Sequence, residues 1–428
     1  MNGVLQSMKL GFLFNHDAGH QAAHLAPILN AYAASSRNVE IYAYVGGAAL
    51  KKSVLANLSA PNVEIVELSL PPLLGATARI LDVAMPASRW TRLTYNADKF
   101  YHLDALVAPE RTSLTLRKAL RAHNVQFIYS GHGAGDRAIG FHPSFARFDL
   151  LLLPGEKYAR RLRETGGLAD NEYALIGYPK FDFVRTTARQ RFFDNDNPTV
   201  VYNPHFSPEF SSWFAGGVRV LEWFAANPDL NLIVAPHVML FRRRLHVSTD
   251  TGRTAWRRDI PASFRRCANI LIDIDSPRLF DMSYMVASDL YLGDISSQVM
   301  EFVVKPRPCV FLNTNRHDWT GDENFAAWRL GPVIDRLDDL GPAIRGALAD
   351  PGRYRDVQIE HFADSFDLTG ETSSIRAVKA IGEFLDRKNA QPQKLRIPVP
   401  APQFADSLAP ARLARSELQH SAERRLGR

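Results

Sequence analysis

The chain has very few cysteines and no long apolar runs. Its 428 residues include two cysteines, Cys267 and Cys309, which are too few for a disulfide framework or a zinc cluster. Both lie in or beside apolar stretches, so we expect buried free thiols. No stretch approaches the roughly 20 apolar residues of a membrane-spanning helix. The N-terminus is typical of a first strand and not of a signal peptide, so we expect a cytoplasmic protein.

The main part of the chain also has little net charge. The whole sequence has a net charge of +6, and residues 388–428 contain eight basic and three acidic residues. The remaining residues are therefore close to neutral, and no basic stripe with interleaved aromatics is evident, which argues against a nucleic-acid partner. No residue cluster has metal-ligand spacing, and we expect neither a metal nor a cofactor. The basic tail would either touch the anionic inner face of a membrane peripherally or serve as a disordered solubility element.

Strand-like and helix-like stretches alternate along the chain, which is the pattern of an α/β fold. Two such series predict two doubly wound Rossmann-like domains facing a cleft, over residues 1–172 and 173–387, followed by the flexible tail 388–428. The Gly-x-Gly-x-x-Gly fingerprint is missing. The segment from Leu70 to Arg92 is expected to be an irregular crossover. Because ligands of doubly wound sheets bind at the carboxyl ends of strands, candidate site residues are those that follow strands.

In the first half, two loops after predicted strands contain histidines. His16 and His20 lie in a small-residue loop after the first strand, where they could contact an anion; the alternative is simple helix capping by Asp17. His132 and Gly133 lie in a loop in which glycines surround the histidine. Histidine is suited to general-base catalysis near neutral pH. A plain glycine-rich turn is the alternative.

In the second half, a predicted strand ends at Ala235 and is followed by Pro236 and His237. Three arginines begin at Arg242, and guanidinium groups match the geometry of phosphate oxygens. A histidine beside several arginines predicts a phosphate-binding loop. A solvated basic turn is the alternative.

A fourth loop follows the strand that ends at Gly293. It contains Asp294, Ser296 and Ser297, and we expect a helix to begin at Ser297 with free N–H groups that bind a nucleotide diphosphate. Glu301, one turn further on, is a candidate acceptor for ribose hydroxyls. A plain helix cap is the alternative.

The motifs together resemble those of the CDP-glycerol glycerophosphotransferases of the teichoic acid polymerase type, a family with a two-domain GT-B-like fold. The family motifs Trp-His-Gly-Thr, Gly-Tyr-Pro-Arg-Asn-Asp, Lys-Pro-His-Pro and Asp-Tyr-Ser-Ser look like segments that occur here in the same order. These segments are Gly131–Ala134, Gly177–Asp182, Ala235–Val238 and Asp294–Ser297, the last followed by Glu301.

The resemblance implies a transferase that moves glycerol phosphate, or a related polyol phosphate, from a CDP-activated donor to a hydroxyl acceptor and releases CMP. It implies that His132 deprotonates the acceptor and that His237 stabilises the transferring phosphate. It also implies that Ser296, Ser297 and Glu301 hold the nucleotide. The acceptor would be a cell-envelope polymer or glycolipid, which can be lipid-linked.

Two other functions are compatible with the same fold. One is a GT-B glycosyltransferase or sugar-nucleotide epimerase that uses a UDP-sugar. The other is a non-catalytic nucleotide-binding protein.

Overall fold

The computed structural model describes residues 7–16, 19, 22–35, 38–82, 85–131, 133–169, 172–184, 189–248 and 251–390. Residues 1–384 form one compact unit and residues 385–428 a second. His20, His132 and residues 391–428 of the predicted tail lie outside the described residues. Within the described part, no helix is both long and apolar enough to span a bilayer.

The first lobe is built on a seven-stranded parallel sheet with the strand order β3-β2-β1-β4-β5-β6-β7. The strands are short apolar runs such as Leu150–Leu153, as expected for parallel strands covered on both faces. Their bounds are β1 (Met8–Phe14), β2 (Val39–Val45), β3 (Val63–Glu67), β4 (Ala105–Ala108), β5 (Gln126–Ser130), β6 (Leu150–Leu153) and β7 (Glu172–Leu175).

The second lobe is built on a six-stranded parallel sheet with the order β12-β9-β8-β13-β14-β15, and a separate hairpin pairs β10 with β11. The strand bounds are β8 (Thr199–Asn203), β9 (Asn231–Val234), β10 (Leu245–Val247), β11 (Thr254–Trp256), β12 (Ile270–Ile272), β13 (Leu290–Gly293), β14 (Cys309–Leu312) and β15 (Val333–Ile334).

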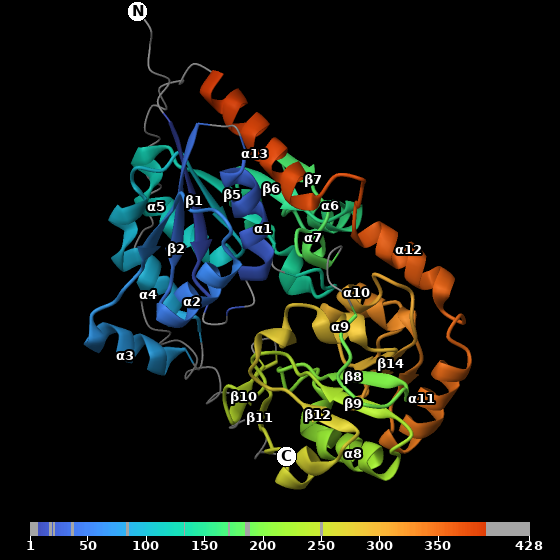
Figure 1. Ribbon diagram of the computed structural model, residues 1–428. Helices are drawn as coiled ribbons and strands as arrows, with labels where there is room; N and C mark the ends of the chain where they lie inside the picture. The colour runs from blue at the N-terminus through green and yellow to red at the C-terminus, as the bar shows by residue number, and fades with distance from the viewer. Residues whose placement is uncertain are drawn as a thin grey trace, which may run out of the picture. The chain divides into compact units, whose positions relative to one another are not determined.

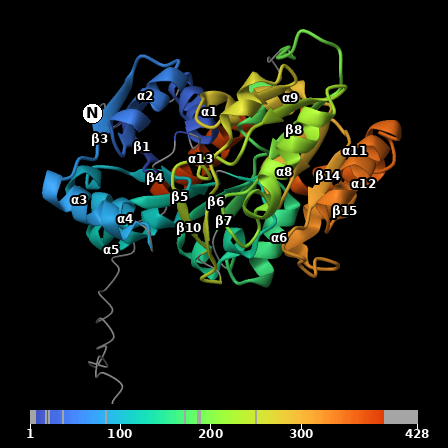
Figure 2. The same cartoon turned by 90° about the horizontal axis from the view of Figure 1, so that it is seen from below.

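Helices connect the strands of both lobes (Figure 1). Their bounds are α1 (Ala22–Ala33), α2 (Ala48–Asn57), α3 (Pro72–Leu81), α4 (Ala87–Tyr95), α5 (Leu116–Ala119), α6 (Glu156–Glu164), α7 (Phe181–Val184), α8 (Ser212–Ala226), α9 (Ser283–Ala287), α10 (Gln298–Phe302), α11 (Leu340–Ala349), α12 (Arg355–Ser365) and α13 (Ser373–Ala390). Helices α3, α4 and α5 group at one end of the first sheet (Figure 2).

Three local expectations were wrong. The strand near Tyr173 was assigned to the second series, but β7 pairs in parallel with β6, so the change of sheet comes after Leu175. The supposed irregular crossover contains the two helices α3 and α4. Strand β4, which was not expected, pairs in parallel with β1 and β5. Of the two cysteines, Cys309 is buried as expected, whereas Cys267 is half-buried, and both are free thiols.

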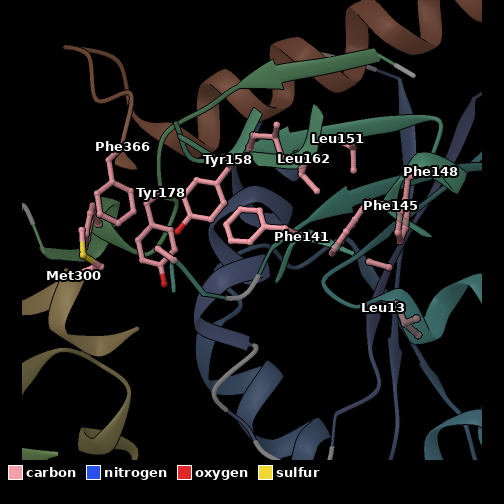
Figure 3. Packing of buried hydrophobic residues seen from close by; sticks show 14 of the residues in the cluster. Leu13, Phe141, Phe145, Phe148, Leu151, Tyr158, Leu162, Tyr178, Met300 and Phe366 are labelled. Carbon is pink, nitrogen blue, oxygen red and sulfur yellow. The ribbon is translucent and has the colours of Figure 1, made fainter. Parts of the chain in front are cut away.

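One hydrophobic cluster extends through both lobes. It contains Phe141 and Tyr158 from the first lobe together with Met300 and Phe311 from the second. Figure 3 shows the aromatic part of this cluster, where the rings of Tyr178 and Phe366 lie 5.2 Å apart. Burying each such side chain contributes roughly 1.5–3 kcal/mol, so this cluster stabilises the contacts between residues of the two lobes.

Candidate functional site

The second sheet reverses its strand order between β8 and β13, where Asn203 pairs with Gly293. A ligand of a doubly wound sheet binds at such a switch point, beyond the carboxyl ends of the strands. The loops after Asn203 and Gly293 are therefore the centre of the candidate site.

Two matched histidines follow the neighbouring strands β8 and β9. Each comes after a proline, and each ring accepts a backbone N–H from two residues later: Ser207 donates to Nδ1 of His205 at 3.0 Å, and Met239 donates to Nδ1 of His237 at 3.2 Å. In a neutral imidazole this leaves the proton on Nε2. The two ring centroids lie 5.5 Å apart, so the loops present two similar Nε2–H donors.

His205 is neutral in this environment. Burial first, then the nearby His237 and Arg137, hold the pKa of His205 well below its ordinary value. Its ring therefore acts as a hydrogen-bond donor and not as a cation. His205 was not among the site residues expected from the sequence. The signal that could have singled out His205 is the repeated Pro-His after a strand, at Pro204 and again before His237.

Asp294 links the two central loops. Its Oδ2 accepts the backbone N–H of His205 at 2.8 Å and that of Ser212 at 2.9 Å. Its buried Oδ1 has no hydrogen-bond partner among the described residues. Burial raises the pKa of Asp294 to about 7. Asp294 therefore organises the His205 loop in addition to its predicted place beside the nucleotide.

The serine loop of the second lobe meets the glycine loop of the first. A Cβ placed on Gly133 would lie 3.6 Å from Oγ of Ser297, and one on Gly135 would lie 3.4 Å from Cβ of Ser297. Oγ of Ser296 accepts the N–H of Gln298 at 3.3 Å. Helix α10, Gln298–Phe302, has five residues. Two of the predicted motifs thus come together, although His132 itself is outside the described residues.

The glycine loop is anchored by Asp136, whose side chain is almost completely buried. Nζ of Lys157, on α6, lies 2.7 Å from Oδ1 of Asp136, while Oδ2 accepts the backbone N–H of Ala327 at 3.0 Å. Because Ala327 belongs to the second lobe, this carboxylate ties the glycine loop to the facing lobe.

Glu301 is held by the Gly177–Asp182 motif. Both of its carboxylate oxygens lie 2.7 Å from Nζ of Lys180, and the hydroxyl of Tyr178 lies 3.3 Å from Oε1. The side chains of Glu301 and Lys180 are each 4% exposed. The structure thus joins two of the predicted motifs in one buried ion pair. The role of Glu301 as a ribose acceptor stays a prediction.

The arginines predicted for the phosphate-binding loop have partners in the structure. Arg243 donates to the backbone oxygen of Asp82 at 2.9 Å and Arg244 pairs with Asp259 at 3.0 Å, while Arg242 is exposed. A cation that was not singled out as a site residue, Arg137, comes from the first lobe with its guanidinium carbon 4.4 Å from the ring centroid of Phe210.

The switch point of the first sheet, between β1 and β4, carries a paired cluster. Arg89 donates to both carboxylate oxygens of Glu110 at 3.1 Å, and Nε2 of His16 lies 3.7 Å from the same carboxylate. Arg92 donates to Oδ1 of Asn15 at 3.1 Å. His16, a predicted site residue, is therefore at a strand-end cluster of the first lobe. Among the described residues, no group of His, Cys, Asp or Glu is arranged to hold a metal ion.

No protein-family model and no curated protein sequence match this chain. Solved structures do. The wall teichoic acid polymerase TagF aligns with a TM-score of 0.59 at 15% identity over 90% of each chain. A TagF variant soaked with CDPG aligns at 0.57 and 14%, again over 90% of each chain. A UDP-N-acetylglucosamine 2-epimerase aligns at 0.58 and 13%, over 90% of this chain and 97% of the other. These likenesses confirm the GT-B-like fold of two Rossmann-like lobes.

Proposed function

We propose that the chain is a transferase that moves glycerol phosphate, or a related polyol phosphate, from a CDP-activated donor to a hydroxyl acceptor. The observation that supports this most strongly is the pair of Nε2–H donors, His205 and His237, at the switch point where the glycine loop meets Ser297. Preorganised donors aimed at one place stabilise developing negative charge on a phosphoryl group.

The proposed step is a single displacement at the phosphorus next to glycerol. The acceptor oxygen forms a new P–O bond while the bond to the bridging oxygen of the diphosphate breaks, and CMP leaves with that electron pair. His132 takes the proton of the acceptor hydroxyl. His205, His237 and Arg137 donate hydrogen bonds or positive charge to the transferring phosphoryl group.

The nucleotide is assigned to the second lobe. Ser296 and Ser297 would contact its phosphates, and Asp294 and Arg242 would lie beside them. Glu301 would accept ribose hydroxyls only if the surroundings of the Lys180 pair open, because the side chain of Glu301 is 4% exposed. In this proposal Lys180 therefore takes part in nucleotide binding through Glu301.

The test is to incubate the purified protein with CDP-glycerol and, separately, with UDP-N-acetylglucosamine. We expect CMP release that depends on an added hydroxyl acceptor. His237→Ala should abolish most of this release, whereas His142→Ala, at an exposed histidine bonded to Ser144, should leave it unchanged.

The other outcomes are distinct. Release of UDP, or 2-epimerisation of the UDP-sugar, without CMP release would favour the sugar-nucleotide alternative. Tight nucleotide binding without turnover of either donor would favour a non-catalytic nucleotide-binding protein. Contact of the tail 388–428 with a membrane, proposed from its charge, is tested by removing residues 391–428 and measuring vesicle binding.

A further inference from the structure

Two hydrogen bonds attach the end of the glycine loop to the second lobe. Oδ2 of Asp136 accepts the backbone N–H of Ala327 at 3.0 Å. Two residues further on, the backbone N–H of Ala138 donates to Oδ1 of Asn324 at 2.7 Å. Both partners belong to the 3₁₀-helix Glu323–Leu330 of the second lobe. We call these two hydrogen bonds the interlobe clamp.

Helix α6 of the first lobe supports the clamp from below the loop. Nζ of Lys157 lies 2.7 Å from Oδ1 of Asp136, and the two side chains are 2% and 3% exposed. Arg161, four residues after Lys157 and so on the same face of the helix, donates to the backbone oxygens of Asp136 and Glu323. One helix face therefore contacts both sides of the clamp.

The buried charges of the clamp have a role that apolar side chains could not fill. Replacing a buried ion pair by apolar residues of similar volume often leaves stability unchanged or higher, so stability alone does not account for the pair. His361 also lies near Asp136, at 3.8 Å, but burial and then Lys157 lower its pKa to about 4, which leaves it neutral. Lys157 is thus the cationic partner of Asp136. The carboxylate differs from an apolar side chain in accepting the N–H of Ala327.

The clamp adjoins the groups assigned to catalysis. Arg137 lies between the two residues of the first lobe that form the clamp, and its guanidinium carbon is 4.4 Å from the ring centroid of Phe210 in the second lobe. A Cβ on Gly135 would lie 3.4 Å from Cβ of Ser297. His132 precedes the clamp by four residues in the sequence. A shift of the clamp would therefore displace Arg137 from the serine and histidine loops.

We propose that Asp136 is a positioning residue, whose carboxylate fixes the glycine loop and Arg137 against the second lobe. Its effect on rate rests on the proposed function. Because small misplacements of reacting groups are costly, loss of the clamp should lower kcat about 10- to 100-fold. The KM for CDP-glycerol should change little, since the nucleotide is assigned to the second lobe.

Two double variants separate the hydrogen bond from the charges. Asp136→Leu with Lys157→Met removes the ion pair and the acceptor for the Ala327 N–H. Asp136→Asn with Lys157→Gln also removes both charges but keeps an amide oxygen at the first position. We expect the first variant to show the loss of kcat and the second to recover most of it. A matched control is Arg160→Leu with Asp364→Leu, which removes an exposed pair of α6 and α12 and should leave kcat unchanged.

Hydrogen exchange followed by mass spectrometry tests the clamp without turnover. In the full chain, the amides of residues 133–138 and 324–327 should exchange faster in the Leu/Met variant than in the wild type and the Asn/Gln variant. Asn324→Ala removes the other bond of the clamp at a half-buried position, and it should raise exchange in the same two segments and lower kcat severalfold.

The outcomes separate this inference from the proposed function. Unchanged exchange in the Leu/Met variant would overturn the clamp, and faster exchange with an unchanged kcat would overturn the positioning role. Equal losses of kcat in the Leu/Met and Asn/Gln variants would also overturn it, because the charges and not the hydrogen bond would then matter. If the wild type releases no CMP while exchange responds as expected, the clamp stands and the proposed function fails.

Discussion

The two sheets carry different chemical groups at their carboxyl edges. At the first edge, charged groups are matched to one another, as where Nη1 of Arg89 donates to both carboxylate oxygens of Glu110. At the second edge, neutral donors such as His205 are fixed by backbone N–H groups. The charges at the first edge are paired with one another, whereas the His205 ring at the second edge is oriented by the N–H that its Nδ1 accepts from Ser207. Under the proposed function, phosphoryl stabilisation therefore belongs to the second edge.

The largest expected effect concerns the buried ion pair at the second edge. Glu301→Ala should lower the free energy of unfolding by about 3–5 kcal/mol, because it leaves the ammonium of Lys180 buried and unpaired. Urea denaturation measures this. The double variant Glu301→Leu with Lys180→Met should recover most of the loss. If Glu301→Ala is as stable as the wild type, Lys180 has access to water that the structure does not indicate.

The next-largest expected effect is on catalysis. Its test compares histidines at the carboxyl edges of the two sheets. Under the proposed function, His205→Ala and His237→Ala should each reduce kcat about 10²–10³-fold, the usual cost of removing one preorganised donor. His16→Ala should reduce it less than about tenfold, because Arg89 already neutralises Glu110 beside it. Steady-state CMP release measures all three. Equal losses at both edges would contradict the assignment of phosphoryl stabilisation to the second edge.

Substitution of one glycine at each edge should have a smaller effect, on stability. A Cβ on Gly46, after β2, would lie 2.1 Å from Nη1 of Arg92, so Gly46→Ala should cost about 1–3 kcal/mol of stability by overpacking. A Cβ on Gly133 meets Ser297 at an ordinary 3.6 Å, so Gly133→Ala should change stability by less than about 0.5 kcal/mol. Thermal unfolding of the two variants decides whether the first edge is the more tightly packed.

The smallest effect is a pH dependence. Burial raises the pKa of Asp294 from 3.8 to about 7, so between these values the folded state binds a proton that the unfolded state has released. Stability from this group therefore falls as the pH rises through that window. Asp294→Asn keeps an acceptor for the N–H groups of His205 and Ser212 but cannot ionise. The difference in stability between the variant and the wild type should grow from low pH to pH 7; a constant difference would show that Asp294 titrates normally.

Sequence reasoning identified the α/β class, most strands and the loops after them. Apolar runs of strand length, and the Gly, Pro and His residues that follow them, can be recognised from neighbouring residues alone. It also chose His237, Ser297 and Glu301 as site candidates. It missed His205 as a donor, since only the hydrogen bond from Ser207 fixes its tautomer. It missed the amphipathic helix α3, since the Pro, Leu and Ala residues between Leu70 and Arg92 were assigned to an irregular crossover.

The chain by itself determined the alternation of strands and helices, the order of the motifs and the local excess of arginine in residues 239–266, because these depend on neighbours in sequence. Only the tertiary structure decided which motifs meet. Glu301 and Lys180 are far apart along the chain, as are Gly133 and Ser297, and the shared hydrophobic cluster brings them together. The same packing decided that α3 presents Leu73 and Ile80 to the outside, since exposure is a property of the surroundings and not of the residue.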